Sequence, residues 1–261
     1  TYTIHNTPKI VGGVTPTCAE MARCFYEQFV SKVVVVSSTG AAEMVKLLEN
    51  TFRSVNIALV NEMALICDRI GLDIWEIVDA AATKPFGFMP FYPGPGIGGH
   101  CIPNDPHYLA WKAKNHRFTA RFIELASEIN GSMAGYVVGK IIDALNLKGK
   151  PLKDSRILIL GVAYKRDVGD TRESPALDII RMLDEREADL HYYDPYAFLS
   201  PGKAKRCEEL TPELLRRFDC VVIVTDHTCV DYQTVVKHSK LIVDCRNATK
   251  RIEGGGKVIK I

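Results

Sequence analysis

A cysteine, two histidines and an aspartate follow closely spaced glycines in the segment "GPGIGGHCIPNDPH", residues 94–107. These residue types suit three kinds of chemistry. Gly94, Gly96 and Gly99 match the dinucleotide pattern G-x-G-x-x-G, the histidines and acid could bind a metal, and the Cys101 thiol could act as a nucleophile. Each possibility needs different neighbouring elements, so the surrounding chain decides between them.

The dinucleotide interpretation requires a hydrophobic strand before the glycines and a helix directly after them, because the helix N-terminus meets the pyrophosphate. Here "FMPFYP" precedes them, and the flanking prolines disfavour a strand. A metal site would use a set of four neighbouring side chains, His100, Cys101, Asp105 and His107. Adjacent His and Cys side chains point apart, and no C-x-x-C pair completes a zinc set. We therefore expect no metal here.

The nucleophile interpretation fits its context better. Asp105-Pro106 is a typical helix start, an N-cap acid followed by proline, so Cys101 is expected a few residues before a helix N-terminus. The partial positive charge there favours a thiolate. The glycines let the backbone approach a ligand and present amides to it. An incidental thiol in a flexible loop is the alternative that spacing alone leaves open.

A second candidate lies on residues 41–70, a run free of Pro and Gly that predicts one long helix. Ser38 or Thr39 would cap it, and Gly71 would end it. Lys46 and Asn50 are four residues apart, hence on one face. An ammonium beside an amide can stabilise an oxyanion. A solvated lysine beside a packing asparagine is the alternative.

The remaining elements predict an α/β protein. "KIVGG", a helix within residues 15–29 and the buried strand "KVVVVSS" give β-α-β order. From "RILILGVAY" to "KLIVDCRN", strands alternate with helices, which implies a doubly wound parallel sheet. We predict a remnant of an N-terminal Rossmann-like domain (1–40), a central helical region (41–147), a linker (148–155) and a C-terminal α/β domain (156–261).

Composition excludes several classes. The 33 Lys and Arg nearly balance the 31 Asp and Glu among 261 residues, so nothing indicates a nucleic-acid or anionic-membrane partner. The apolar runs are of strand length, far below a membrane span. Eight scattered cysteines indicate a reduced, cytoplasmic protein. The chain opens without Met and with no clear element before "KIVGG", so we expect a piece of a longer protein.

Three long segments carry a family resemblance: "PFYPGPGIGGHCIPNDPHYLAWKAK", "EMVKLLENTFRSVNIALVNE" and "GVAYKRDVGDTRESPALDII". Together they resemble the UDP-sugar 6-dehydrogenases, NAD-dependent enzymes that oxidise the C6 alcohol of a nucleotide sugar to a carboxylate in two hydride transfers. "GPGIGGHCIP", with "KPFGFMPFYP" upstream, resembles the branch acting on UDP-N-acetylglucosamine and related 2-acetamido sugars. The resemblance also implies a homodimer through the long helix 41–70.

The resemblance assigns roles residue by residue. Cys101 matches the nucleophile, which adds to the C6 aldehyde as a thiohemiacetal and then holds the acyl group as a thioester. Lys46 and Asn50 match the residues that stabilise oxygen charge, and Asp105 matches the acid that orients a water. The nucleotide-sugar ligands would be Phe91, Tyr92, Gly98, Lys165 and Arg246. Arg172 matches a residue on the NAD side, and an ion pair with Asp170 or Glu173 is its alternative.

The chain also departs from the family pattern. No strand–loop–helix with a true G-x-G-x-x-G occurs, so we expect that unit upstream of Thr1 and expect these residues alone not to turn over NAD at a normal rate. Asn104 stands where the glucose branch usually has Lys, which argues against UDP-glucose. Two rivals remain: a non-catalytic dimer module that binds nucleotide sugar, and a hydroxyacid dehydrogenase, which has no need of a thiol.

Overall fold

The computed structural model describes residues 2–198 and 202–261. The chain forms two compact units, Thr1–Arg53 and Ser54–Ile261. The first unit contains the parallel strands β1 (Lys9–Gly12) and β2 (Val33–Val36), joined by helix α1 (Pro16–Tyr26), which packs on both strands. The β-α-β order is as predicted. The predicted burial of the second strand is wrong, because one helix covers one face only and Val35 is 45% exposed.

The long helix is present as α2 (Thr39–Ile70). Its start is capped by Ser38, whose hydroxyl accepts the Ala41 N–H at 3.1 Å. It ends at Gly71, whose φ of 75° is the left-handed conformation that terminates many helices. Three more helices follow in the second unit: α3 (Ile74–Ala81), capped by Asp73, then α4 (Cys101–Asn115) and α5 (Arg121–Asn146).

The second unit contains one six-stranded parallel sheet. Its strands are β3 (Arg156–Leu160), β4 (Asp189–Tyr193), β5 (Lys205–Arg206), β6 (Cys220–Ile223), β7 (Ile242–Asp244) and β8 (Val258–Lys260). Their order, β5-β4-β3-β6-β7-β8, reverses direction between β3 and β6. This is the order of a doubly wound fold, in which ligands bind beyond the carboxyl ends of the strands at the reversal. The predicted fold class is confirmed.

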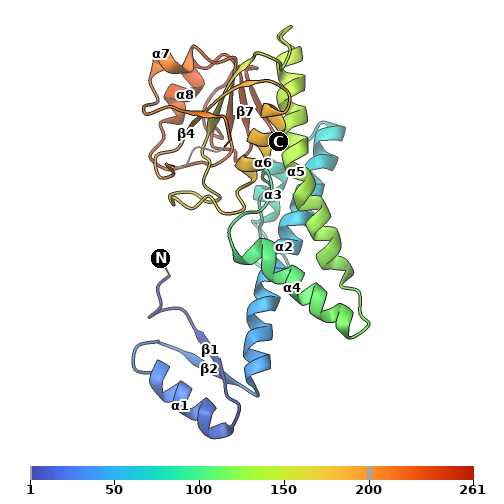
Figure 1. The fold of residues 1–261 in the computed structure, drawn as a ribbon, viewed down its shortest axis with the longest axis vertical. Helices are drawn as coiled ribbons and strands as arrows, with labels where there is room; N and C mark the ends of the chain where they lie inside the picture. The colour runs from blue at the N-terminus through green and yellow to red at the C-terminus, as the bar shows by residue number, and fades with distance from the viewer. Residues whose placement is uncertain (1, 199–201) are drawn as a thin grey trace. The chain divides into compact units, whose positions relative to one another are not determined.

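Helices cover both faces of this sheet (Figure 1). Helices α5 and α6 (Pro175–Asp184) pack on one face, where Met133, Ile141 and Ile179 join a core with Ile157 and Ile159. Helices α7 (Pro212–Leu215) and α8 (Tyr232–His238) border the core of the other face. Helix α5 therefore belongs to the same hydrophobic core as the sheet.

Two further predictions on the elements are wrong, and one stays open. The helix after the glycines begins at Cys101, not at Asp105-Pro106. Strands β5 and β8 were missed because they are short and only partly buried. The proposed division into 1–40, 41–147, 148–155 and 156–261 stays a prediction.

Candidate active site

Cys101 is the first residue of α4, and its thiol is exposed. The first backbone N–H groups of a helix have no partner within the helix, so the sulfur lies at the positive end of the helix dipole. Asp105 is therefore not an N-cap but stands four residues further along, on the same face one turn away. Pro106 lies inside the helix, where it leaves the carbonyl of Ile102 without an amide partner.

The glycine loop, residues 94–99, is held by protein contacts rather than open to a ligand. The Gly94 N–H donates to Asn61 Oδ1 and the Gly99 N–H to the carbonyl oxygen of Arg172, both at 2.9 Å. A Cβ on Gly98 would lie 2.6 Å from the Glu173 carbonyl oxygen. The expectation that these glycines offer amides to a ligand is thus wrong for two of them. Their lack of side chains lets the loop pack closely against the residues around α6.

Two buried asparagines fix the start of this loop. Asn61 on α2, besides accepting from Gly94, donates to Asn130 Oδ1 on α5 at 2.9 Å. Asn130 in turn donates to the Ser54 carbonyl at 3.1 Å. Both side chains are at least 95% buried. A single chain of amide hydrogen bonds therefore connects two helices to the loop that leads to Cys101.

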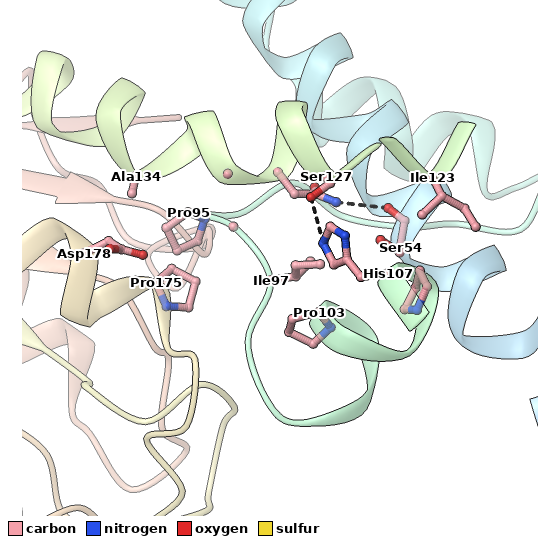
Figure 2. Close-up of a pocket in the computed structure, with 14 residues that line it drawn as sticks. Ser54, Pro95, Ile97, Pro103, His107, Ile123, Ser127, Ala134, Pro175 and Asp178 are labelled. Atoms are coloured by element: carbon pink, nitrogen blue, oxygen red, sulfur yellow. Dashed lines mark hydrogen bonds between the residues drawn. The ribbon is translucent and has the colours of Figure 1, made fainter. Parts of the chain in front are cut away.

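A cavity of about 150 Å³ lies behind the glycine loop. Figure 2 shows His107 of α4 pointing toward Ser127 of α5, to which it is hydrogen-bonded at 3.0 Å, while Pro95 of the loop lies beside Pro175 of α6. This contact joins the helix that carries Cys101 to the helix that packs on the sheet. The nucleophile thus stands on a supported element.

Tyr92 and Arg246, both predicted ligands of a nucleotide sugar, line one hollow of about 330 Å³. The Tyr92 ring stacks on Trp75, with centroids 5.9 Å apart, and its hydroxyl donates to Asp79 at 2.9 Å. That hydrogen bond raises the pKa of Tyr92. Phe91, next to it, is half-buried. The arrangement gives a flat aromatic surface beside a guanidinium.

The Arg246 guanidinium lies against the glycine loop, since a Cβ on Gly94 would meet it at 2.5 Å. Its Nε donates to the Val224 carbonyl at 2.8 Å, and burial lowers the pKa of Arg246. Within residues 2–198 and 202–261 it forms no ion pair with an acid. The hollow also contains two ion pairs, Lys250 with Asp79 and Arg166 with Asp226. A cation without an acidic partner can attract a phosphate.

Lys165 and Arg172 differ in their surroundings. Lys165 follows β3, at the point where the strand order reverses, and its side chain is exposed with no hydrogen bond or ion pair in the described part of the chain. Arg172 instead pairs with Asp170 through its Nε and its Nη2 at 2.6 Å, which is the alternative weighed for it. This hydrogen bond raises the pKa of Arg172, with smaller effects from Tyr164 and Cys101. The Arg172 backbone contacts the glycine loop, since its carbonyl oxygen accepts the Gly99 N–H at 2.9 Å.

Lys46 and Asn50 lie on α2 in the first unit, as spaced in the prediction. Lys46 is exposed, whereas Asn50 is fully buried and accepts a hydrogen bond from the Arg53 guanidinium. Cys101 belongs to the second unit, so the partnership of these side chains with the thiol stays a prediction.

Comparisons with known proteins address the whole chain. Residues 40–132 match the central domain of the UDP-glucose/GDP-mannose dehydrogenase family, and residues 158–251 match its UDP-binding domain. A UDP-N-acetyl-D-mannosamine dehydrogenase of Methanococcus maripaludis is 40% identical over 219 residues, which are 84% of this chain and 49% of that protein. The chain belongs to the UDP-glucose/GDP-mannose dehydrogenase family.

Solved structures of this family have the same fold. The UDP-D-ManNAc dehydrogenase of Pyrococcus horikoshii superposes with a TM-score of 0.87 at 34% identity, over 99% of this chain and 60% of that one. The NDP-N-acetyl-D-galactosaminuronic acid dehydrogenase of Methanosarcina mazei gives 0.85 at 27% identity, over 99% and 58%. The chain spans about half the length of the curated relatives it matches. UDP-sugar dehydrogenases of this family use NAD.

One feature of the domain that matches the UDP-binding family was not predicted from the sequence: the first amides after β3 are hydrogen-bonded within the protein. In a dinucleotide-binding fold the loop after the first strand presents amides to a pyrophosphate. The corresponding amides here belong to Val162 and Ala163. They donate to the Asp194 carboxylate at 2.8 and 3.0 Å. These amides are therefore satisfied by the protein, and a bound diphosphate must find other donors. The signal was the acid in "YYDP" at the end of a strand.

Two general findings complete the site. None of the helices in residues 2–198 and 202–261 is both long and apolar enough to cross a membrane. The same residues hold no cluster of three or more His, Cys, Asp or Glu side chains placed to bind a metal ion.

Proposed function

We propose that this chain carries the thiol and the nucleotide-sugar half of an NAD-dependent UDP-2-acetamido-sugar 6-dehydrogenase. The observation that carries the proposal is the position of Cys101. Its exposed sulfur stands at the N-terminus of α4, one turn from Asp105, directly after a loop that is packed against residues around α6. A thiol placed in this way suits covalent catalysis on a bound sugar.

In the proposed reaction Cys101 bonds covalently to C6 of the sugar. Loss of a first hydride and a proton from the C6 alcohol gives the aldehyde. The sulfur adds to this aldehyde, the thiol proton passes to the former carbonyl oxygen, and a thiohemiacetal forms. Loss of a hydride and a proton gives a thioester, and water cleaves it to the carboxylate and the free thiol. NAD supplies the hydride acceptor when it is bound. Asp105, on the same helix face as Cys101, would orient the water.

Arg172 is the one residue of the second unit that we assign to NAD binding. The Arg172 guanidinium is exposed and its backbone holds the Gly99 amide beside the start of α4, although the side chain pairs with Asp170. It would hold NAD by its charge from the side of the thiol. Lys46 and Asn50 would stabilise oxygen charge at C6 during the oxidations.

The nucleotide would bind across the end of the sheet. Lys165 beyond β3 and Arg246 beyond β7 supply cations for the diphosphate, while Phe91, Tyr92 and Gly98 would lie along the sugar and nucleotide. Side-chain cations are the expected donors here because the amides after β3 are taken by Asp194.

We infer a 2-acetamido sugar as the substrate class. The relatives reported above are named for N-acetyl-D-mannosamine and N-acetyl-D-galactosaminuronic acid. The sequence motifs led us to expect UDP-N-acetylglucosamine, and the names of the relatives favour UDP-N-acetylmannosamine, its epimer at C2. Calorimetric affinities for the two UDP-sugars decide between them, since one epimer should bind at least ten-fold more tightly.

A non-catalytic nucleotide-sugar-binding module is the alternative. Cys101→Ser distinguishes the two functions, with Cys229→Ser as the matched control at another exposed cysteine. We expect all three proteins to bind the UDP-sugar. On mixing with the UDP-sugar C6 aldehyde, native mass spectrometry should show a covalent adduct in wild type and control but not in Cys101→Ser. Binding without any adduct in the wild type would favour the alternative.

We also propose a homodimer through the long helix. In the second unit α2 presents four exposed apolar side chains at alternating spacings of four and three residues, Leu59, Met63, Ile66 and Ile70. Such a stripe is the pattern of a helix seam. Sedimentation equilibrium should give a dimer for the wild type and a shift to monomer for Ile66→Glu. A monomeric wild type at micromolar concentration contradicts the proposal.

A further inference from the structure

A buried pair of side chains joins the loops that follow three adjacent strands of the sheet, β4, β3 and β6. We call residues 161–168, after β3, the sheet loop. Asp194, at the end of β4, accepts the Val162 and Ala163 amides of this loop, and His227, beyond β6, donates to the same carboxylate from Nε2 at 3.1 Å. Asp194 and His227 are each 1% exposed. The pair therefore lies beneath the edge where the strand order reverses.

The hydrogen bonds define the protonation of His227. The backbone N–H of Asp167 points at Nδ1 at 3.0 Å, so Nδ1 accepts. Nε2 faces a carboxylate and donates. The ring is thus neutral, with its proton on Nε2. A second proton, on Nδ1, would place two donors face to face.

These contacts fix both ends of the short stretch that carries Lys165. On one side Ala163 donates its amide to Asp194 and accepts from the Thr225 hydroxyl at 2.6 Å. On the other side Asp167, at a φ of 59°, is bound to His227 by its amide and to Thr228 by its carboxylate at 2.9 Å. Lys165 stands between these two anchors, exposed at the sheet end.

We propose that neutral His227, together with Asp194, is a positioning pair that fixes the sheet loop and so orients Lys165 toward the diphosphate of the nucleotide sugar. This inference rests on the proposed function of the site. Neither side chain touches the ligand; each acts through the backbone on both sides of Lys165. Protonation of His227 releases the Asp167 amide and leaves that end of the loop held by the contacts of the Asp167 carboxylate with Thr228 alone.

Several other titratable groups face His227. The Asp167 carboxylate lies 3.9 Å from Nδ1, the Tyr196 ring stands 5.1 Å from the imidazole, and the Tyr232 hydroxyl of α8 donates to the His227 carbonyl. Cys229 is hydrogen-bonded to Tyr196. Asp226, which directly precedes His227 in the sequence, forms an ion pair with Arg166. Among these groups and Asp194, histidine is the side chain that ordinarily changes charge between pH 8 and pH 5.

The test compares wild type with His227→Gln. Glutamine places an amide donor where Nε2 stands, keeps the contact to Asp194 and takes up no proton. Its oxygen is bonded to Cδ, one atom further along the side chain than Nδ1 of histidine, so no acceptor stands at the position that Asp167 uses. We expect wild-type affinity for the preferred UDP-2-acetamido sugar, measured by calorimetry, to fall about ten-fold from pH 8 to pH 5.5. The variant should bind at both pH values as weakly as wild type does at pH 5.5. His191→Gln, at a half-buried histidine of β4, should keep the wild-type pH dependence.

Hydrogen exchange gives a second readout that needs no ligand. The Asp167 amide should exchange about ten-fold faster in His227→Gln than in wild type at pH 8, while the Val162 and Ala163 amides stay protected. The positioning pair is overturned if the Asp167 amide exchanges at the same rate in both proteins. It is also overturned if the affinity of His227→Gln for the UDP-sugar depends on pH as that of the wild type does. A wild type that binds no UDP-sugar contradicts the proposed function instead. The exchange rate of the Asp167 amide then still tests whether His227 and Asp194 fix the sheet loop.

Discussion

The glycine loop and the sheet loop both border the proposed nucleotide-sugar site, and buried side chains hold both by hydrogen bonds, but the side chains differ in chemistry. Asn61 and Asn130, two neutral amides, hold the first. Asp194, a carboxylate, and His227, an imidazole, hold the second. Both pairs are buried, and both satisfy backbone N–H groups. The difference is that only the second pair consists of ionisable side chains.

This difference teaches what each loop can respond to. Amide hydrogen bonds keep their donors and acceptors at every pH, so the loop that leads to Cys101 should stay in place wherever the protein is folded. The carboxylate–imidazole pair changes its hydrogen bonds on protonation, so the loop that carries Lys165 should be sensitive to acid. The three predictions below test this contrast.

The largest expected effect is that of Gly161→Ala, at the start of the sheet loop. Gly161 has a φ of 83°, and a Cβ there would lie 2.6 Å from the Thr225 carbonyl oxygen. Backbone strain and overpacking together should cost about 3 kcal/mol of unfolding free energy. Gly98→Ala, where φ is not positive, should cost about 2 kcal/mol by overpacking alone. Urea unfolding measures both, and equal losses would contradict the distinction.

Asn61→Leu should have the next largest effect. Leucine is similar in size but leaves the Gly94 N–H and the side-chain Oδ1 of Asn130 without the partners they have in the wild type, in a buried region. The expected loss is about 2 kcal/mol of unfolding free energy. This loss should be the same at pH 8 and pH 5.5, because no group in the network titrates. A loss that varies with pH over this range would show that the two loops are coupled.

Much of the frame was predictable from sequence because its signals are local. The apolar runs of β3 and β6, the Ser38 cap of α2 and the Gly71 exit each act within a few residues. Cys101 and Tyr92 were assigned to the site in the same way, from a motif, and their roles stay predictions. Strand β8, three half-buried residues after a glycine run, carries no such signal.

The contacts that hold the loops were not predictable, because they join distant residues. Asn61 and Asn130 are 69 positions apart, and Asp194 and His227 are 33 apart. No periodicity links such pairs before the helices and strands are packed. The start of α4 was predicted wrongly for a different reason. Asp105-Pro106 is a good local start, but Pro103 also lies in the first turn, where a proline costs no hydrogen bond, so the helix begins earlier.

The smallest effect concerns acid stability. Burial raises the pKa of Asp194, but hydrogen bonds from His227 and from backbone amides lower it by more, so the value falls from 3.8 to about 2. Because the folded-state pKa is the lower one, the carboxylate stabilises the fold above pH 4. This contribution, about 2 kcal/mol, is lost as the pH falls toward 2. Asp68 and Asp219 also have lowered pKa values and add to the slope in every variant. The informative quantity is therefore the difference between wild type and Asp194→Asn in urea unfolding from pH 6 to pH 3, which should shrink as acid is added. A difference that stays constant would show that the sheet loop, like the glycine loop, is held without regard to charge.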